Sequence, residues 1–403
     1  MNTMEKQTRT SGTLRAVVLV IAACIIHGIM QGIHDNFGIM MKGLVGTAGF
    51  SYAYVSFCIG VGALLYGVAQ PFLGMLALKK SNAFVILLGT LCTAAGLAIS
   101  PLCRSEITLM IFFGILLPLG TTGLCFGIVM GAITPFLGKK QAAIVSGIVQ
   151  ASAGIGDALM SPALQTLSDT FGIRTAMTTF AVPFIALIPI VLWLGAMNKN
   201  NSIRVEEKEE DTALIPMLKT AFKDRNYRLI LLGFGTCGFN MSIIESHLYS
   251  QYTAGGISNS AASLTLTVYG IATMVGAVAT GYLGTKFRMK NVLAGAYGLR
   301  VVISIGFLIL PLSAPLAFTA SALLGLCGDA TVPPTSGIIS HLFGARKMAA
   351  LYGFAMIGHQ VGAFASATLG GIFVSQGLGY APLWIVNLCL AAFASACSYR
   401  INL

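Results

Sequence analysis

The sequence predicts an all-α membrane protein of twelve transmembrane helices, arranged as two pseudo-symmetric six-helix bundles. Three observations lead to this prediction: the composition of the chain, the spacing of its hydrophobic runs and the positions of its basic residues. Of the 403 residues, 56% are hydrophobic and only 9% are charged. So little charge cannot cover a soluble protein of this length, whereas a bilayer accepts apolar surface.

Hydrophobic runs of spanning length recur along the chain, because a helix crosses about 30 Å of hydrocarbon at about 1.5 Å per residue. They cover residues 15–40, 50–76, 83–102, 106–135, 142–168, 174–197, 228–252, 260–283, 290–311, 315–342, 348–376 and 381–402. One longer polar stretch separates the sixth run from the seventh. We therefore expect an N-terminal bundle over 1–197, a cytosolic linker or regulatory segment over 198–227, and a C-terminal bundle over 228–403.

The basic residues indicate the orientation of the chain. If the N-terminus is cytosolic, all 24 Lys and Arg residues lie in cytosolic segments except Lys42, Arg104, Arg174 and Arg300. An odd number of spans would spoil this alternation. We expect a monomer in the inner (plasma) membrane with both termini in the cytoplasm. The net charge of +11 is not gathered in one patch, so a nucleic-acid partner is not expected.

Weak internal repeats connect the two halves. Cys24 and His34 in the first run share their spacing with Cys237 and His247 in the seventh. Residues 74–80 (GMLALKK) and 281–286 (GYLGTK) each occupy the second cytosolic break of their half. Such parallel signals indicate a duplicated bundle with a path for solute between the halves.

The loops at 74–80 and 281–286, each of which begins with a glycine and ends with lysine, resemble the signature loop of the major facilitator superfamily and its pseudo-copy. Leu78 and Thr285 replace the acidic residue that is usual there. Further motifs look like the bacterial monocarboxylate and oxalate/formate transporter branch. They are Gln70-Pro71, 138–140 followed by Ser146-Gly147, 332–337 and 358–364. The resemblance implies the major facilitator fold and a secondary transporter that moves a small organic anion by alternating access. The predicted eighth helix of this chain, 260–283, lacks the arginine that often contacts the substrate carboxylate in transporters of that branch.

Two functions remain as alternatives to anion transport. Efflux of drugs or hydrophobic metabolites is the main alternative, and its expected sign is an acidic residue deep in the cavity at helix 1 or helix 4. A receptor on the same fold is a further alternative. The sequence contains no GxxxxGK[ST] motif, so transport driven by ATP is not expected. It also contains no cluster of nucleophiles or metal ligands of the kind that an enzyme would need. We therefore expect no cofactor and no metal, and small-molecule substrate, protons and lipid as the partners.

Ionisable and amide side chains at membrane depth are the candidate site residues, because a polar group in hydrocarbon is costly unless it faces a cavity or a partner. Those predicted to contact substrate are Arg300, His359, His27, Asn240, Gln31 and Gln360. Those predicted to couple protons or to gate the path are Asp329, Glu245, His247, Asp157, His34 and Asp35.

Several of these roles have a structural alternative. Arg300 either neutralises an anionic substrate or pairs permanently with Asp329 on the next helix. The histidines at 27 and 359 either face the central cavity or make a hydrogen bond between helices. The groups near the outer mouth, His34-Asp35 and Glu245 with His247, either act as a gate or only order that mouth. Asp157 is expected at a similar depth, with a structural or a coupling role.

Overall fold

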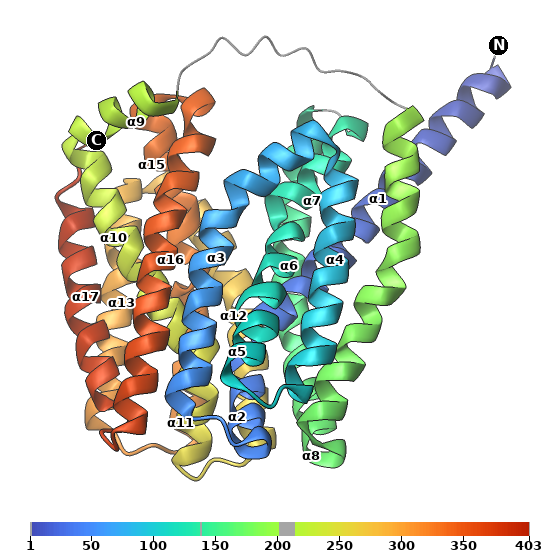
Figure 1. Ribbon diagram of the computed structural model, residues 1–403. Coiled ribbons are helices and arrows are strands. Elements are labelled where there is room, and N and C mark those ends of the chain that lie inside the picture. Colours follow the sequence, from blue (N-terminus) through green and yellow to red (C-terminus); the bar gives the residue numbers. More distant parts are fainter. Residues whose placement is uncertain (1, 138, 201–213, 403) are drawn as a thin grey trace.

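The computed structural model describes residues 2–137, 139–200 and 214–402, and within them the chain is almost entirely helical (Figure 1). Eleven of the described segments are long and apolar enough to cross a bilayer. One of them, Val145–Ala196, has 52 residues and contains two crossings, because Gly172 breaks its helix with φ 80° and ψ 160°. The eleven segments therefore hold the twelve predicted crossings, and the expected fold class is confirmed.

The N-terminal half holds six crossings, several of them interrupted. Its first crossing joins two helices, its fourth contains a π-helical turn, and its fifth and sixth share one label. The elements are α1 (Asn2–His34), α2 (Phe37–Ala48), α3 (Tyr52–Lys79), α4 (Asn82–Ile99), η1 (Ser100–Leu102), α5 (Glu106–Leu109), η2 (Met110–Leu116), α6 (Leu117–Gly123), α7 (Phe126–Ile133), η3 (Thr134–Phe136) and α8 (Lys139–Asn200).

The C-terminal half is interrupted at two crossings, the seventh by a π-helical turn and the tenth by a 3-10 turn. Its elements are α10 (Arg225–Ser242), η4 (Ile243–Leu248), α11 (Tyr249–Ala254), α12 (Asn259–Lys286), α13 (Met289–Ile309), α14 (Ala314–Cys327), η5 (Asp329–Thr331), α15 (Val332–Phe343), α16 (Ala345–Ser375) and α17 (Ala381–Tyr399).

The segment between the halves contains one described helix, α9 (Leu214–Lys223). Ala221 is 1% exposed and joins the core around Tyr227, while Phe222 packs edge-on against Phe354. Residues 201–213 of the predicted linker lie outside the described residues. The domain boundaries at 197 and 228 therefore stay a prediction.

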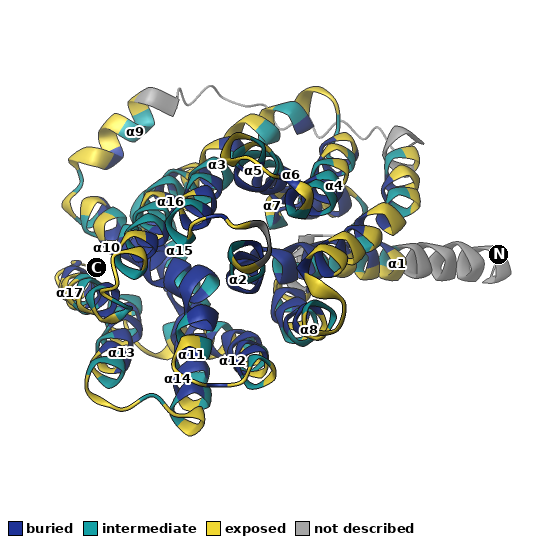
Figure 2. Cartoon of the chain, turned by 60° about the horizontal axis from the view of Figure 1, so that its bottom comes forward, coloured by how far each residue is buried: buried dark blue, intermediate teal, exposed yellow. Residues whose placement is uncertain are grey.

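Apolar side chains cover the outside of the molecule as well as its core. On the second part of α8, Val182, Ile185 and Leu192 are each more than half exposed. Figure 2 shows such exposed positions on the outward faces of α8, α13 and α17, while α2 lies centrally among other helices. A soluble monomer rarely exposes so much apolar surface, and lipid is the solvent that accepts it.

Glycines let the first and fifth crossings of each half approach closely. A Cβ atom on Gly156 would lie 1.9 Å from the carbonyl oxygen of Gly28, which brings α8 against α1. In the second half, a Cβ atom on Gly362 would lie 2.0 Å from the carbonyl oxygen of Gly235, which brings α16 against α10. Small residues at such crossings allow backbone contact in lipid, where the hydrophobic effect no longer drives helices together.

The two halves meet through α3 with α16, α8 with α12, and α2 with η4. Polar contacts join them at the end where α2 and α11 lie, opposite the linker helix α9 (Figure 1). Lys42 donates to Asn259 at 2.8 Å, and the Tyr52 hydroxyl lies 2.9 Å from Nδ1 of His247. The halves are therefore packed together at the α2–α11 end of the molecule.

The glycine contacts predict a specific stability effect. Replacing Gly362 with alanine should lower the free energy of unfolding by about 1–3 kcal/mol, because the new methyl group collides with the backbone of α10. The matched control is Gly353→Ala on the same helix, where an added Cβ meets nothing within 4 Å. Thermal unfolding of the purified variants in detergent measures both. Equal unfolding temperatures for the two variants would contradict this account of the packing.

Candidate functional site

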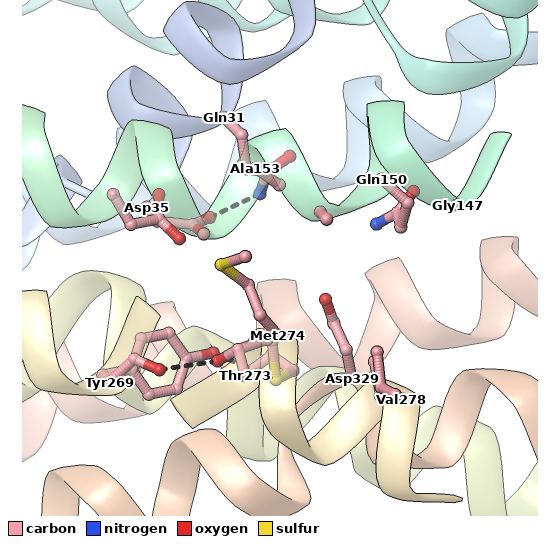
Figure 3. A pocket seen from close by; sticks show the side chains of 15 residues that line it. Gln31, Asp35, Gly147, Gln150, Ala153, Tyr269, Thr273, Met274, Val278 and Asp329 are labelled. Carbon is pink, nitrogen blue, oxygen red and sulfur yellow. Dashed lines mark hydrogen bonds between the residues drawn. The ribbon is translucent and has the colours of Figure 1, made fainter. Parts of the chain in front are cut away.

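A cavity of about 220 Å³ lies between the two halves. One wall contains Gln31 of α1, Asp35 in the turn after α1, and Gln150 of α8. Figure 3 shows these residues facing Tyr269, Met274 and Asp329 on the other wall. Asp157 belongs to the same lining, as do Gly147 and Val278 farther along α8 and α12. The described lining thus contains three carboxyl groups and no basic side chain.

A break in the first crossing brings Asp35 to this cavity. α1 ends at His34 and α2 begins at Phe37, and the Asn36 side chain fills the break by donating to the carbonyl of Gly32 at 2.7 Å. Gln31, one turn earlier, donates to Oδ1 of Asp35 at 2.8 Å (Figure 3). Asp35 therefore projects from a helix end between the halves and is held there by an amide.

Asp157 of α8 lies next to Asp35, so that two carboxyl groups are neighbours in the cavity wall. Asp157 is 4% exposed, and its Oδ1 has no hydrogen-bond partner among the described residues. Two neighbouring carboxylates repel one another when both are ionised, and a proton on one of them removes this repulsion. The contact is therefore a place where the protein can hold a proton.

A π-helical turn in the seventh crossing positions Glu245 and His247. Such turns are frequent at functional sites because the extra residue redirects the side chains around it. Glu245 lies near His34 and Asp35, with one ligating atom of each residue within 4.8 Å of the others. His247 points elsewhere: Nδ1 contacts the Tyr52 hydroxyl, and Nε2 lies 3.1 Å from the carbonyl oxygen of Ala367.

The aromatic neighbours of His34 explain its burial. Its ring is 9% exposed and lies 4.8 Å from the ring centre of Tyr66 and 5.5 Å from that of Phe37. Its Nδ1 has no hydrogen-bond partner within the described part of the chain.

Arg300 contacts a helix break and not a carboxylate. Its Nη2 donates to the carbonyl oxygens of Cys327 and Gly328 at 2.7 and 2.9 Å, where α14 ends. A cation is favourable at a helix C-terminus, where carbonyl groups lack helical partners. The alternative of a direct ion pair with Asp329 is not found in the structure: the carbonyls of Cys327 and Gly328 accept from the guanidinium, and Asp329 lines the cavity. Arg300 is 1% exposed and is absent from that lining.

Two further predicted substrate ligands lie inside the helical halves. His27 is 3% exposed, its ring lies edge-on to Phe126 at 5.8 Å, and neither ring nitrogen has a partner among the described residues. Asn240 is 1% exposed and donates to Asn387 of α17 at 3.3 Å. Neither residue belongs to the described cavity lining.

The remaining two predicted ligands lie on α16. Gln360 is 6% exposed, and its side chain lies against Gly67 of α3, so it belongs to the contact between the halves. His359 is half-buried, with its ring centre 5.0 Å from that of Phe234, and its Nδ1 has no hydrogen-bond partner among the described residues. Neither residue belongs to the described lining of the cavity.

Tyr269, Thr273 and Met241 line the cavity but were not predicted from the sequence. The side chains of these residues carry no charge, and similar ones occur along many spans. A tyrosine in the eighth crossing that is 3% exposed, as Tyr269 is, gives no separate signal.

A family comparison decides what this architecture is. The model of the Major Facilitator Superfamily matches residues 19–255 and 252–401, which is nearly the whole chain. This chain belongs to the Major Facilitator Superfamily. It is therefore a membrane transporter and not an enzyme.

Curated relatives of this transporter are distant but cover most of its length. It is 20% identical to the uncharacterized MFS-type transporter YcxA of Bacillus subtilis (strain 168), over 95% of this chain and 93% of that protein. It is 23% identical to monocarboxylate transporter 11 of Mus musculus, over 88% and 80% of the two chains.

Solved structures support the same fold. A D-xylose-proton symporter matches with a TM-score of 0.74 at 11% identity, over 96% of this chain and 98% of that one. A bacterial homolog of the human lysosomal transporter Spinster, in an inward-facing unoccupied conformation, matches with a TM-score of 0.69 at 16% identity, over 96% and 94%. These similarities show the fold alone.

The contacts of Arg300 predict that it stabilises this transporter in the absence of any solute. Arg300→Met should lower the free energy of unfolding by about 1–3 kcal/mol, because the carbonyls of Cys327 and Gly328 lose a buried donor. Thermal unfolding in detergent without added solute measures this, with Arg104→Met, an exposed arginine, as the control. Unchanged stability together with lost solute binding would contradict the structural role and favour direct contact with an anion.

Proposed function

We propose that this transporter moves a small organic anion of the monocarboxylate type together with protons, by alternating access. The observation that carries the proposal is the pair of neighbouring carboxyl groups, Asp35 and Asp157, in the wall of the cavity between the halves. The likeness to monocarboxylate transporter 11 supports the substrate class, and the named proton coupling of the D-xylose symporter is a precedent on the same fold.

Electrostatics makes the proton a condition for anion binding. With effective dielectric constants near 20, two like charges about 4 Å apart repel by about 4 kcal/mol. An anion that enters beside ionised Asp35, Asp157 and Asp329 would meet this repulsion from each carboxylate it approaches. Protons on these carboxyls remove the repulsion and turn an acceptor into a donor for the substrate carboxylate. Anion and proton therefore bind together, which is symport.

The position of the acidic residues relates protonation to movement. Asp35 and Asp157 belong to the N-terminal half, and Glu245 approaches Asp35 from the C-terminal half. The halves are packed together at the α2–α11 end, while the cavity extends along α8 and α12 to Gly147 and Val278. Loss of the protons would leave carboxylates of the two halves facing each other, and their repulsion favours separation at the packed end.

Other candidate residues support this cycle in our proposal. Gln31 orients Asp35, and the amide of Gln150 supplies a hydrogen bond to the solute from the same wall. His34, Glu245 and His247 act at the junction of the halves as a gate. In the proposed orientation, which the positive-inside pattern supports, the linker and both termini lie on the cytoplasmic side of the inner membrane.

A second candidate function has an observation of its own. Efflux of a cationic drug or hydrophobic metabolite calls for an acidic residue in the cavity at helix 1, and Asp35 stands at the break of the first crossing. A cation would bind the ionised carboxylates and leave when protons replace it. This mode is antiport, so the direction of the proton effect separates it from anion symport.

Uptake by proteoliposomes tests the proposal. With a panel of monocarboxylates and dicarboxylates, a pH gradient that is acidic outside should accelerate uptake of at least one acid. Asp157→Asn should lower this gradient-driven uptake by about tenfold or more, because the carboxyl pair can no longer exchange a proton. Glu106→Gln, which changes an exposed carboxylate, is the matched control and should transport as the unchanged protein does.

One result of these uptake measurements would reject anion transport. If no acid is taken up while lipophilic cations exchange, and if acidification on the side of entry inhibits that exchange, then the anion proposal is wrong and the efflux candidate replaces it.

A further inference from the structure

Three side chains with metal-ligating atoms meet where the first and seventh crossings touch. They are His34 and Asp35 at the end of α1 and Glu245 in η4, with one ligating atom from each lying within 4.8 Å of the others. The first two belong to the N-terminal half and the third to the C-terminal half. The cluster therefore forms only while the halves are together at this end.

Unpartnered polar atoms in and beside the cluster indicate that it lacks a ligand. His34 is 9% exposed, yet its Nδ1 has no hydrogen-bond partner among the described residues. Asp157, a neighbour of Asp35 in the cavity lining, is 4% exposed and has an unpartnered Oδ1. Buried polar atoms are nearly always satisfied in native proteins, and leaving one without a partner costs about 1–3 kcal/mol.

Basic side chains do not neutralise the cluster. The guanidinium of Arg300 is engaged with the carbonyls of Cys327 and Gly328, and Lys42 donates to Asn259. No ion pair to Asp35 or Glu245 occurs in the described ranges of the chain. Protons or a bound cation are the remaining ways to compensate these carboxylates.

We propose that His34, Asp35 and Glu245 bind a divalent transition-metal ion of the Zn²⁺ class. An imidazole nitrogen with two carboxylate oxygens is a ligand set for such metals, whereas Mg²⁺ and Ca²⁺ take oxygen ligands. Ligands about 2.1 Å from an ion lie no more than about 4.2 Å apart, so the three groups need to move together only slightly. The open coordination positions remain for water, for Asp157 or for a solute carboxylate.

Binding of the metal has a mechanical consequence. Because its ligands come from both halves, the ion holds the α2–α11 end closed and opposes the separation that transport requires. The ion also competes with the protons of Asp35. The inference shares Asp35 with the proposed function, but metal binding does not depend on which solute is transported.

Calorimetric titration of Zn²⁺ into purified, metal-free protein in detergent tests the site. The unchanged protein should bind one Zn²⁺ ion, and His34→Asn and Glu245→Gln should each weaken binding by at least about tenfold. His341→Asn and Glu106→Gln are matched controls, because both residues are exposed and lie on other elements. Mg²⁺ should produce no comparable heat.

Thermal unfolding provides a readout that is independent of both transport and the heat of binding. Zn²⁺ should raise the unfolding temperature of the unchanged protein and of the two control variants, but not that of His34→Asn or Glu245→Gln. Zn²⁺ binding that is absent in the unchanged protein, or undiminished in both ligand variants, would overturn the inference. Acid uptake that fails while this site binds Zn²⁺ would reject only the proposed substrate, so the two failures are distinguishable.

Discussion

The proximity of the carboxyl groups of Asp35 and Asp157 in the cavity wall is the feature on which the proposed mechanism depends. In a bilayer-spanning protein a charge must be paired, solvated in a cavity or neutralised, because hydrocarbon offers it nothing. The described lining of the central cavity supplies carboxyl groups without a basic partner. Protons, or a cation in their place, therefore become part of the structure and link its charge to its conformation.

Helix breaks bring these acidic groups to the cavity. Asp35 follows the end of α1, Glu245 stands in the π-helical turn η4, and Asp329 begins the 3-10 turn after α14. An unbroken helix pairs its backbone groups throughout the membrane interior, whereas a break within a membrane leaves some unpaired and is tolerated only where protein or a cavity satisfies them. Asn36 and Arg300 do so at two of the breaks, by donating to Gly32 and to the carbonyls at the end of α14. The helix breaks thus bring the acidic residues to the cavity, and polar side chains nearby satisfy the backbone groups that the breaks expose.

The sequence predicted the fold well because span length and charge alternation are local properties. Depth along a helix was also informative, since Asp157 and Asp35 were expected at similar levels and the structure brings them into contact. Depth says nothing about which face of a helix a residue occupies. For that reason the sequence left open whether Arg300 meets a substrate or Asp329, and whether His27 faces the cavity. In the structure Arg300 bonds to backbone carbonyls, and His27 is buried against Phe126. Hydrophobic span length and charge alternation do not predict the π-helical turn η4, which directs Glu245 and His247 to different partners.

Infrared spectroscopy of the purified protein at neutral pH tests the central claim most directly, because the carbonyl band of a protonated carboxyl group is distinct from the bands of a carboxylate. The account predicts such a band in the unchanged protein without any solute, a clear loss of its intensity in Asp157→Asn, and no loss in Glu106→Gln. A spectrum in which the unchanged protein shows no protonated carboxyl band at neutral pH would contradict a shared proton between Asp35 and Asp157, and with it the proposed coupling.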